Sequence, residues 1–238
     1  MKLRAFLYGL LLFLQSALVI TGGAVRLTGS GLGCPTWPEC TPGSYTPVPH
    51  QAEGQLHAWI EFGNRLLTFA LVLSALVVLI HVLKTGRKDL RWLAAGQVLG
   101  IFGQGVLGGI TVLTDLHPLP VAGHLLLSII LIAAATSLYS RRELPATTRT
   151  DLDPLTKRIS LAHIALSFAV IVLGTLVTGS GPHAGDEKAR RFGFDIRTMA
   201  WLHADVVIAL LGLTAAFYIL VRNDKELSRR IGIFTAIA

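Results

Sequence analysis

A group of polar side chains interrupts an otherwise apolar stretch of the chain, "HAWIEFGNRLL" at residues 57–67. On a helix, the spacing of His57, Glu61 and Asn64 puts them on one face. Arg65 follows Glu61 by one helical turn and can pair with it. Two interpretations are equally supported. One is a Glu–Arg pair that fixes helix packing; the other is a carboxylate in a low-dielectric site, suited to proton transfer or to stabilising positive charge.

Three histidines lie at a similar depth in apolar segments. His57, His124 and His203 each lie at, or about one turn inside, the same end of a predicted membrane-spanning helix. Neutral imidazoles on facing helices are common ligands of a heme iron, whose ring needs an apolar slot. Their common depth therefore predicts heme ligation, with the histidines of the second and fourth helices converging in one bundle.

The only two cysteines of the chain lie in "GLGCPTWPECTPG", residues 31–43. Pro and Gly can fold the short turn between Cys34 and Cys40, and the loop is predicted to face the oxidising side of the membrane. We favour a disulfide that stiffens a long loop. A redox-active dithiol facing an active site is the alternative, and the sequence leaves it open.

Composition places these groups in a membrane protein. The chain has 238 residues, a mean hydropathy of +0.61 and only 15% charged residues, against about 25% in soluble domains. The net charge of +7 sits in short clusters between apolar runs, which favours membrane anchoring and argues against nucleic-acid binding. Six runs approach the length of a membrane span: residues 5–25, 57–83, 92–113, 121–139, 159–177 and 199–221.

The distribution of Lys and Arg predicts the orientation. Fifteen lie on the side of the N-terminus and five on the opposite side, with Arg65 inside a span. The N-terminus is therefore expected in the cytoplasm of the cell, with loops 27–56, 114–120 and 178–198 outside. The first run lacks a signal-peptide cleavage site and is expected to be a retained helix. A further run at 231–238 suggests that a longer bundle continues beyond it.

A short repeat predicts an internal duplication. Thr-Gly-Ser-Gly occurs at residues 28–31 and again at 178–181, each time just past the outer end of a predicted helix. The two copies follow the first and the fifth predicted spans. A repeat length of four spans implies two tandem four-helix units. The expected fold is an all-α membrane protein of eight helices, six of them complete here. Residues 1–140 would form the N-terminal half and residues 159–238 part of the C-terminal half.

Five segments together resemble the heme A synthase family, in the same order and topology along residues 1–238: "GGAVRLTGSGLGCPTWPEC", "IEFGNRLLTF", "HLLLS", "VTGSGPHAGD" and "WLHAD". The resemblance implies an eight-helix membrane oxidoreductase that acts on a CH group. It would oxidise a methyl group of heme O to the formyl group of heme A, with water as oxygen source, for terminal oxidase assembly. The N-terminal half would hold the substrate heme, and the C-terminal half a heme b that carries electrons.

The resemblance also implies roles for individual residues. Glu61 matches the catalytic glutamate, His124 the helix-four heme ligand and His203 the helix-six ligand of heme b. Cys34 and Cys40 match the loop pair of the family. Implied partners are the lipid bilayer, heme O handed over by a heme O synthase, and an electron acceptor that the sequence does not identify; a homo-oligomer is left open. On charge alone, and not from the resemblance, Arg26 or Arg65 is a candidate partner of heme propionates.

Two departures from the family pattern affect the heme sites. The family has a histidine where this chain has Asn64, and asparagine is a poor iron ligand. Either His124 holds the substrate heme from one side, or His57 takes over; about 10 Å of helix rise between positions 57 and 64 favours the first. The partner of His203 would lie on an eighth helix beyond residue 238. Aligning Asn64 with His203 pairs Glu61 with Ala200, which suits one reactive site and one electron-transfer site.

Other classes of membrane protein share some of these features. A di-heme cytochrome b-type electron-transfer subunit would also use histidines on facing helices, but would need neither Glu61 nor the cysteine loop. A transporter would break its helices near the midplane. The segment "GQGVLGG" at residues 103–109 is rich in glycine, but small residues there more often allow close helix packing or leave room for a flat ligand.

Overall fold

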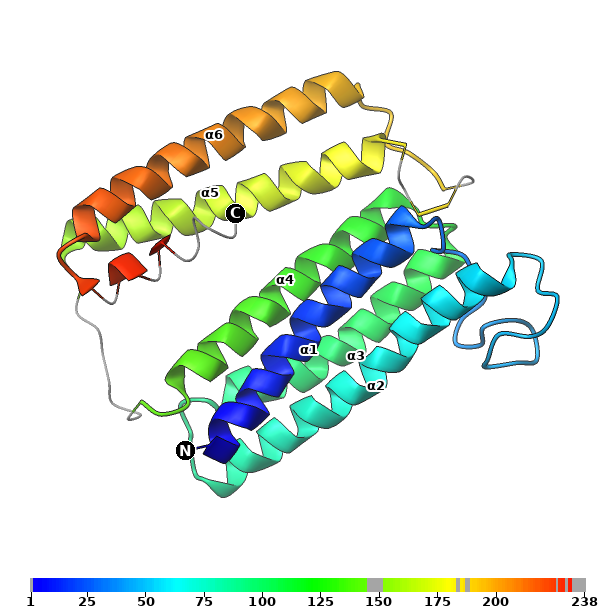
Figure 1. Cartoon of the computed structure of the whole chain (residues 1–238), viewed down its shortest axis with the longest axis horizontal. Helices are drawn as coiled ribbons and strands as arrows, with labels where there is room; N and C mark the ends of the chain where they lie inside the picture. Colours follow the sequence, from blue (N-terminus) through cyan, green and yellow to red (C-terminus); the bar gives the residue numbers. More distant parts are fainter. Residues whose placement is uncertain are drawn as a thin grey trace. The chain divides into compact units, whose positions relative to one another are not determined.

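The structure, a computed structural model, describes residues 2–144, 152–182, 185–186, 189–225, 227–229 and 231–232. All six helices are long and apolar enough to cross a membrane. They contain the six predicted spans, so the prediction of an all-α membrane protein is confirmed. Most of the run at 231–238 lies outside the described residues. The helices are α1 (Lys2–Leu27), α2 (Gln55–Lys84), α3 (Arg91–Leu113), α4 (Pro118–Arg141), α5 (Pro154–Ser180) and α6 (Ile196–Val221) (Figure 1).

Local capping signals explain why two helices begin before their apolar runs. α4 and α5 each start with proline, whose missing N–H costs nothing in the first turn. The side chain of His117 accepts the Leu119 N–H ahead of α4. Asp153 accepts the N–H groups of Leu155 and Thr156 ahead of α5. Polar caps therefore extend both helices past the apolar sequence.

The chain divides into two compact units. The first comprises Met1–Thr148 together with Pro182–Arg191, and the second comprises Arg149–Gly181 together with Phe192–Ala238. Helices α1 to α4 belong to the first unit and α5 and α6 to the second. The interpretation of residues 1–140 and 159–238 as two repeated four-helix halves stays a prediction.

The four helices of the first unit form a closed bundle. α1 packs against α2 and α4, and α3 packs against the same two helices, so α2 and α4 face each other diagonally across the bundle (Figure 1). The loops after α1 and after α3 lie at one end, which we call the loop end. The first turns of α2 and α4 start there. Glu61 and His124, on these two helices, are therefore near the same end of one bundle.

The buried apolar core runs from the middle of the bundle to the end opposite the loop end. Leu11, Val78 and Leu138 are among its fully buried members. A polar link crosses this region: Gln15 donates to Gln97, and Gln97 donates to the Leu131 carbonyl, both at 2.8 Å.

Several half-buried glycines lie in the half of the bundle next to the loop end, which we call the loop half. A Cβ added at any of them would meet no atom within 4 Å. The glycines are Gly22 and Gly23 on α1, Gly63 on α2, Gly105 on α3 and Gly123 on α4.

An ion-pair cluster holds the opposite end together. Arg87 makes two hydrogen bonds of 2.9 Å to Asp89, which also receives one from Arg141. The hydrogen bonds from Arg87 hold the pKa of the Asp89 carboxyl below its ordinary value. Because the folded-state pKa lies below the unfolded one, the cluster contributes stability above the unfolded pKa and loses it as the pH falls through the folded value.

In the second unit, α5 and α6 pack as a pair, linked by His163 Nε2 and Thr214 Oγ1 at 2.9 Å. The repeated Thr-Gly-Ser-Gly differs here from the prediction. Its first copy follows the end of α1, where Gly29 has a φ of 67°; its second copy lies within the last turn of α5 and beyond, since α5 continues to Ser180. α5 ends at Ser180, because Pro182 disfavours a helical backbone at the residue before it, and Gly181 is extended.

Candidate functional site

A disulfide closes the loop that follows α1. Cys34 and Cys40 are bonded, and both are fully buried. The predicted disulfide is confirmed, and the redox role of the pair stays a prediction.

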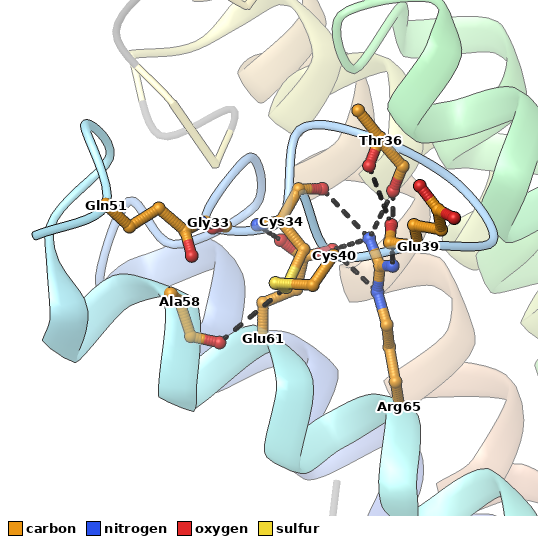
Figure 2. Close-up of polar contacts among 9 residues, drawn as sticks. All are labelled: Gly33, Cys34, Thr36, Glu39, Cys40, Gln51, Ala58, Glu61 and Arg65. Carbon is orange, nitrogen blue, oxygen red and sulfur yellow. Dashed lines mark hydrogen bonds and ion pairs between the residues drawn. A yellow bond between two sulfur atoms is a disulfide. The ribbon is translucent and has the colours of Figure 1, made fainter. Parts of the chain in front are cut away.

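Glu61 and Arg65 project from α2 onto this loop (Figure 2). The Arg65 guanidinium lies 2.6 Å from Glu61 Oε1, and the second carboxylate oxygen, Oε2, accepts the backbone N–H of Cys34. Arg65 also donates to three backbone carbonyls of the loop, those of Cys34, Thr36 and Glu39. Glu61 is only 6% exposed. The predicted Glu–Arg pair exists, and its further contacts are with the disulfide loop.

Close backbone approach explains why the loop rests on α2. A Cβ at Gly33 would collide with the His57 carbonyl, so only glycine allows this contact. Gln51, itself buried, donates to the Gly33 carbonyl (Figure 2). The ring of Trp37 lies where a side chain at Gly109 of α3 would be. The loop therefore covers Glu61 and contacts α2 and α3.

His57 and Asn64 lie on the same helix as Glu61 but have different partners. His57 Nδ1 is 2.9 Å from Ser30 Oγ, next to the end of α1. Asn64 Oδ1 accepts a hydrogen bond of 2.6 Å from the Thr21 hydroxyl of α1. Both side chains thus form hydrogen bonds with α1 or with the residues that directly follow it. Their roles toward a heme stay predictions, including the alternative that His57 replaces the usual helix-two ligand.

His124 lies on α4 with its ring against a glycine of α3. A Cβ at Gly108 would be 3.5 Å from His124 Cε1. The Nδ1 atom of His124 is buried and has no hydrogen-bond partner among the described residues. Such an unpaired buried nitrogen is uncommon because it costs free energy. An imidazole with an unpaired buried nitrogen, packed against a glycine, fits a heme ligand.

His203 has the same local arrangement in the second unit. A Cβ at Gly174 of α5 would be 3.3 Å from His203 Cε1, and His203 Nδ1 is likewise buried without a partner in the described part of the chain. An imidazole nitrogen is a suitable iron ligand, and Gly174 leaves space beside it, so His203 also fits a heme ligand. The ligand roles of both histidines stay predictions.

Sequence reasoning missed several residues of this site. Ser30, Thr21 and Gln51 bind the candidate residues, and no motif marks them. Gly108 and Gly174 make space for the two imidazoles; their position opposite a histidine depends on how neighbouring helices pack. For these glycines, the only indication in the sequence was the glycine-rich segment of α3.

Replacing both cysteines by serine should lower the free energy of unfolding by about 2 kcal/mol, because a short closed loop is opened. Arg65 should still seat the loop, so the protein should fold. Thermal or denaturant unfolding in detergent measures the change. Wild-type protein in reductant should fall to the stability of the double variant, whereas the variant itself should not respond to reductant. An unchanged midpoint in the double variant would show that the disulfide contributes nothing.

Comparisons with known proteins place the chain in a family. The family model described as cytochrome oxidase assembly protein (COX15-CtaA) matches residues 5–185. The chain is similar to curated heme A synthases. That of Geobacillus thermodenitrificans is 28% identical over 120 residues, 49% of this chain and 35% of the relative. That of Shewanella oneidensis is 31% identical over 175 residues, 68% and 51% of the two chains.

A longer match covers nearly the whole chain. The heme A synthase of Rhizobium johnstonii is 28% identical over 271 residues, which is 98% of this chain and 70% of the relative. The matches to the Geobacillus and Shewanella proteins span 35% and 51% of those relatives' length. No solved structure matches the chain.

Proposed function

The chain belongs to the cytochrome oxidase assembly protein family, and from that premise we propose that it is a heme A synthase, an oxidoreductase of heme biosynthesis that converts heme O to heme A. One observation carries the proposal. Glu61 and His124, whose buried Nδ1 has no partner among the described residues, lie in the loop half of one four-helix bundle, on helices that face each other diagonally. Several half-buried glycines lie in the same half.

The proposed reaction adds one oxygen atom from water to a methyl group of the substrate. The methyl group and one water give a formyl group, four protons and four electrons. Glu61 would stabilise positive charge at the edge of the substrate ring, or accept a proton from the water that adds. The electrons pass to a one-electron acceptor outside the chain.

Arg65 and the disulfide loop would prepare Glu61 for this role. The guanidinium lies 2.6 Å from the carboxylate and offsets part of the cost of holding a negative charge in this buried position. The Cys34 N–H and the loop above it restrict the carboxylate to one position and shield it from water. Preorganised charge of this kind is usually the largest electrostatic contribution to catalysis. A contact of Arg65 with heme propionates would require its guanidinium to release one of the loop carbonyls that it binds.

His124 and His203, each with a buried Nδ1 that has no partner among the described residues, would hold the hemes. His124 would bind the iron of the substrate, and the glycine beside it gives the ring of His124 its place. His203 would bind a heme b in the second unit, and that heme supplies one-electron transfer when bound. Both assignments rest on a donor type that suits iron.

The proposed setting is the cell membrane. We place the N-terminus in the cytoplasm and the disulfide loop outside, on the distribution of Lys and Arg. An oxidising exterior agrees with the disulfide. A heme O synthase would supply the substrate, from within the same bilayer.

A conversion assay without oxygen tests the proposal. The purified chain is loaded with heme O under argon and given a soluble one-electron acceptor, and the hemes are then extracted and identified by mass spectrometry. We expect heme A, with none formed when the protein is omitted. Bound and reducible heme that is never converted would instead support an electron-transfer subunit of the cytochrome b type.

A further inference from the structure

A glutamine of α3 makes two hydrogen bonds beside the candidate iron ligand. Gln104 Nε2 donates to Ser128 Oγ at 2.6 Å and to the backbone carbonyl of His124 at 3.1 Å. Because a carbonyl oxygen only accepts, these contacts decide which end of the amide is nitrogen. Oε1 is therefore the other end of the group. It is buried and has no hydrogen-bond partner among the residues that the structure describes.

This unpaired oxygen lies along the α3–α4 contact that also holds His124. Gln104 and Gly108 are one helical turn apart and share a face of α3, and the His124 ring lies against Gly108. Two buried polar atoms without partners in the described part of the chain, Gln104 Oε1 and His124 Nδ1, thus belong to neighbouring residues of α3 and α4. Next to Gln104, a Cβ at Gly105 would meet no atom within 4 Å. A buried acceptor with no donor is costly, so the site is suited to a ligand that brings one.

We propose that Gln104 Oε1 accepts a hydrogen bond from the hydroxyl group of the hydroxyethylfarnesyl side chain of heme O. The inference rests on the proposed function and names the group by which the site recognises its substrate. Heme O differs from protoheme in carrying this side chain where protoheme has a vinyl group.

The chemistry of the other substituents points to the same group. Ionised propionates only accept hydrogen bonds, and a carbonyl oxygen would repel them. Methyl and vinyl groups have no donor. The hydroxyl is the neutral donor at the edge of the ring, and an uncharged amide oxygen in apolar surroundings is a suitable acceptor. A site built around such a bond discriminates against a ligand that lacks the hydroxyl, because its acceptor then stays unpaired.

The test compares heme O with a derivative dehydrated to the alkene, which keeps the farnesyl tail and lacks the hydroxyl. Absorbance titration of the heme-free chain gives both dissociation constants. Wild-type protein should prefer heme O by roughly tenfold. Gln104→Leu should reduce that preference to about one, mainly by weakening the binding of heme O. Gln104→Met, which keeps the length and lacks the oxygen, provides a second reading if the leucine variant does not fold.

Ser128→Ala is the matched control. It removes a partner of Gln104 Nε2 and leaves Oε1 in place, so the preference for heme O should persist. Equal affinity of the wild type for both hemes would overturn the inference and leave the proposed function intact. A preference that survives in the Gln104 variants would overturn it as well. Failure of the wild type to bind either heme would instead contradict the proposed function.

Discussion

Replacement of Glu61 by glutamine should leave heme bound and lower the conversion of heme O to heme A at least a hundredfold, on the scale of losing one preorganised electrostatic group. Glutamine has the shape of glutamate and keeps an oxygen that can accept the Cys34 N–H or an Arg65 N–H. It removes the negative charge. Quantifying extracted hemes after incubation with heme O measures bound substrate and product together.

Glu39→Gln is the control for this experiment. Glu39 is an acid of the same loop, and its side chain accepts only the Gly43 N–H among the described contacts. Its loss should leave conversion close to that of the wild type. Normal heme A formation by Glu61→Gln would show that the carboxylate serves only to seat the loop.

Replacement of Arg65 by methionine should be the most destabilising change at this site, lowering the free energy of unfolding by roughly 3–5 kcal/mol. Glu61 would be left as a buried charge without its partner. The carbonyls of Cys34, Thr36 and Glu39 would also lose their shared donor. Unfolding in detergent by heat or denaturant measures the loss.

Two further variants show whether the buried charge is the cause. Arg65→Lys keeps the charge but not the planar fork, so it should recover only part of the stability. Combining Arg65→Met with Glu61→Gln should be less destabilising than Arg65→Met alone, because no unpaired charge remains. A loss under about 1 kcal/mol for Arg65→Met would class the pair with weak surface ion pairs.

The sequence predicted the six helices because long apolar runs are a strong signal of membrane spans. It was less accurate at their ends, where local polar groups decide. Asp153 and Pro154 extend α5 before its apolar run. At its other end, the helical Gly179 and Ser180 extend α5 into the repeat that was expected to follow it.

The sequence predicted which side chains of the candidate site pair with each other. It did not predict which backbone groups these side chains bind. The spacing of Glu61 and Arg65 on a helix predicted their pair. The sequence did not predict that the pair would bind carbonyls of the disulfide loop. Every residue has a backbone carbonyl, and no sequence feature indicates which carbonyls accept these hydrogen bonds. The position of the loop also depends on the close approach between Gly33 and the His57 carbonyl.

The glycine-rich segment of α3 shows the same limit. Its composition predicted either close packing or room for a flat ligand. Gly108 and Gly109 pack closely against His124 and Trp37, whereas a Cβ at Gly105 would meet no atom within 4 Å. Which glycine has which role depends on the rotation of α3 within the bundle, and composition carries no information about that rotation.

The central claim is that His124 holds the iron of the substrate heme, and resonance Raman spectroscopy of the chain loaded with ferrous heme O tests it directly. We predict an iron–imidazole stretching band in the wild type, its loss in His124→Gly, and its return when free imidazole is added to that variant. An unchanged band in His124→Gly before imidazole is added would contradict the claim and place the iron on another ligand.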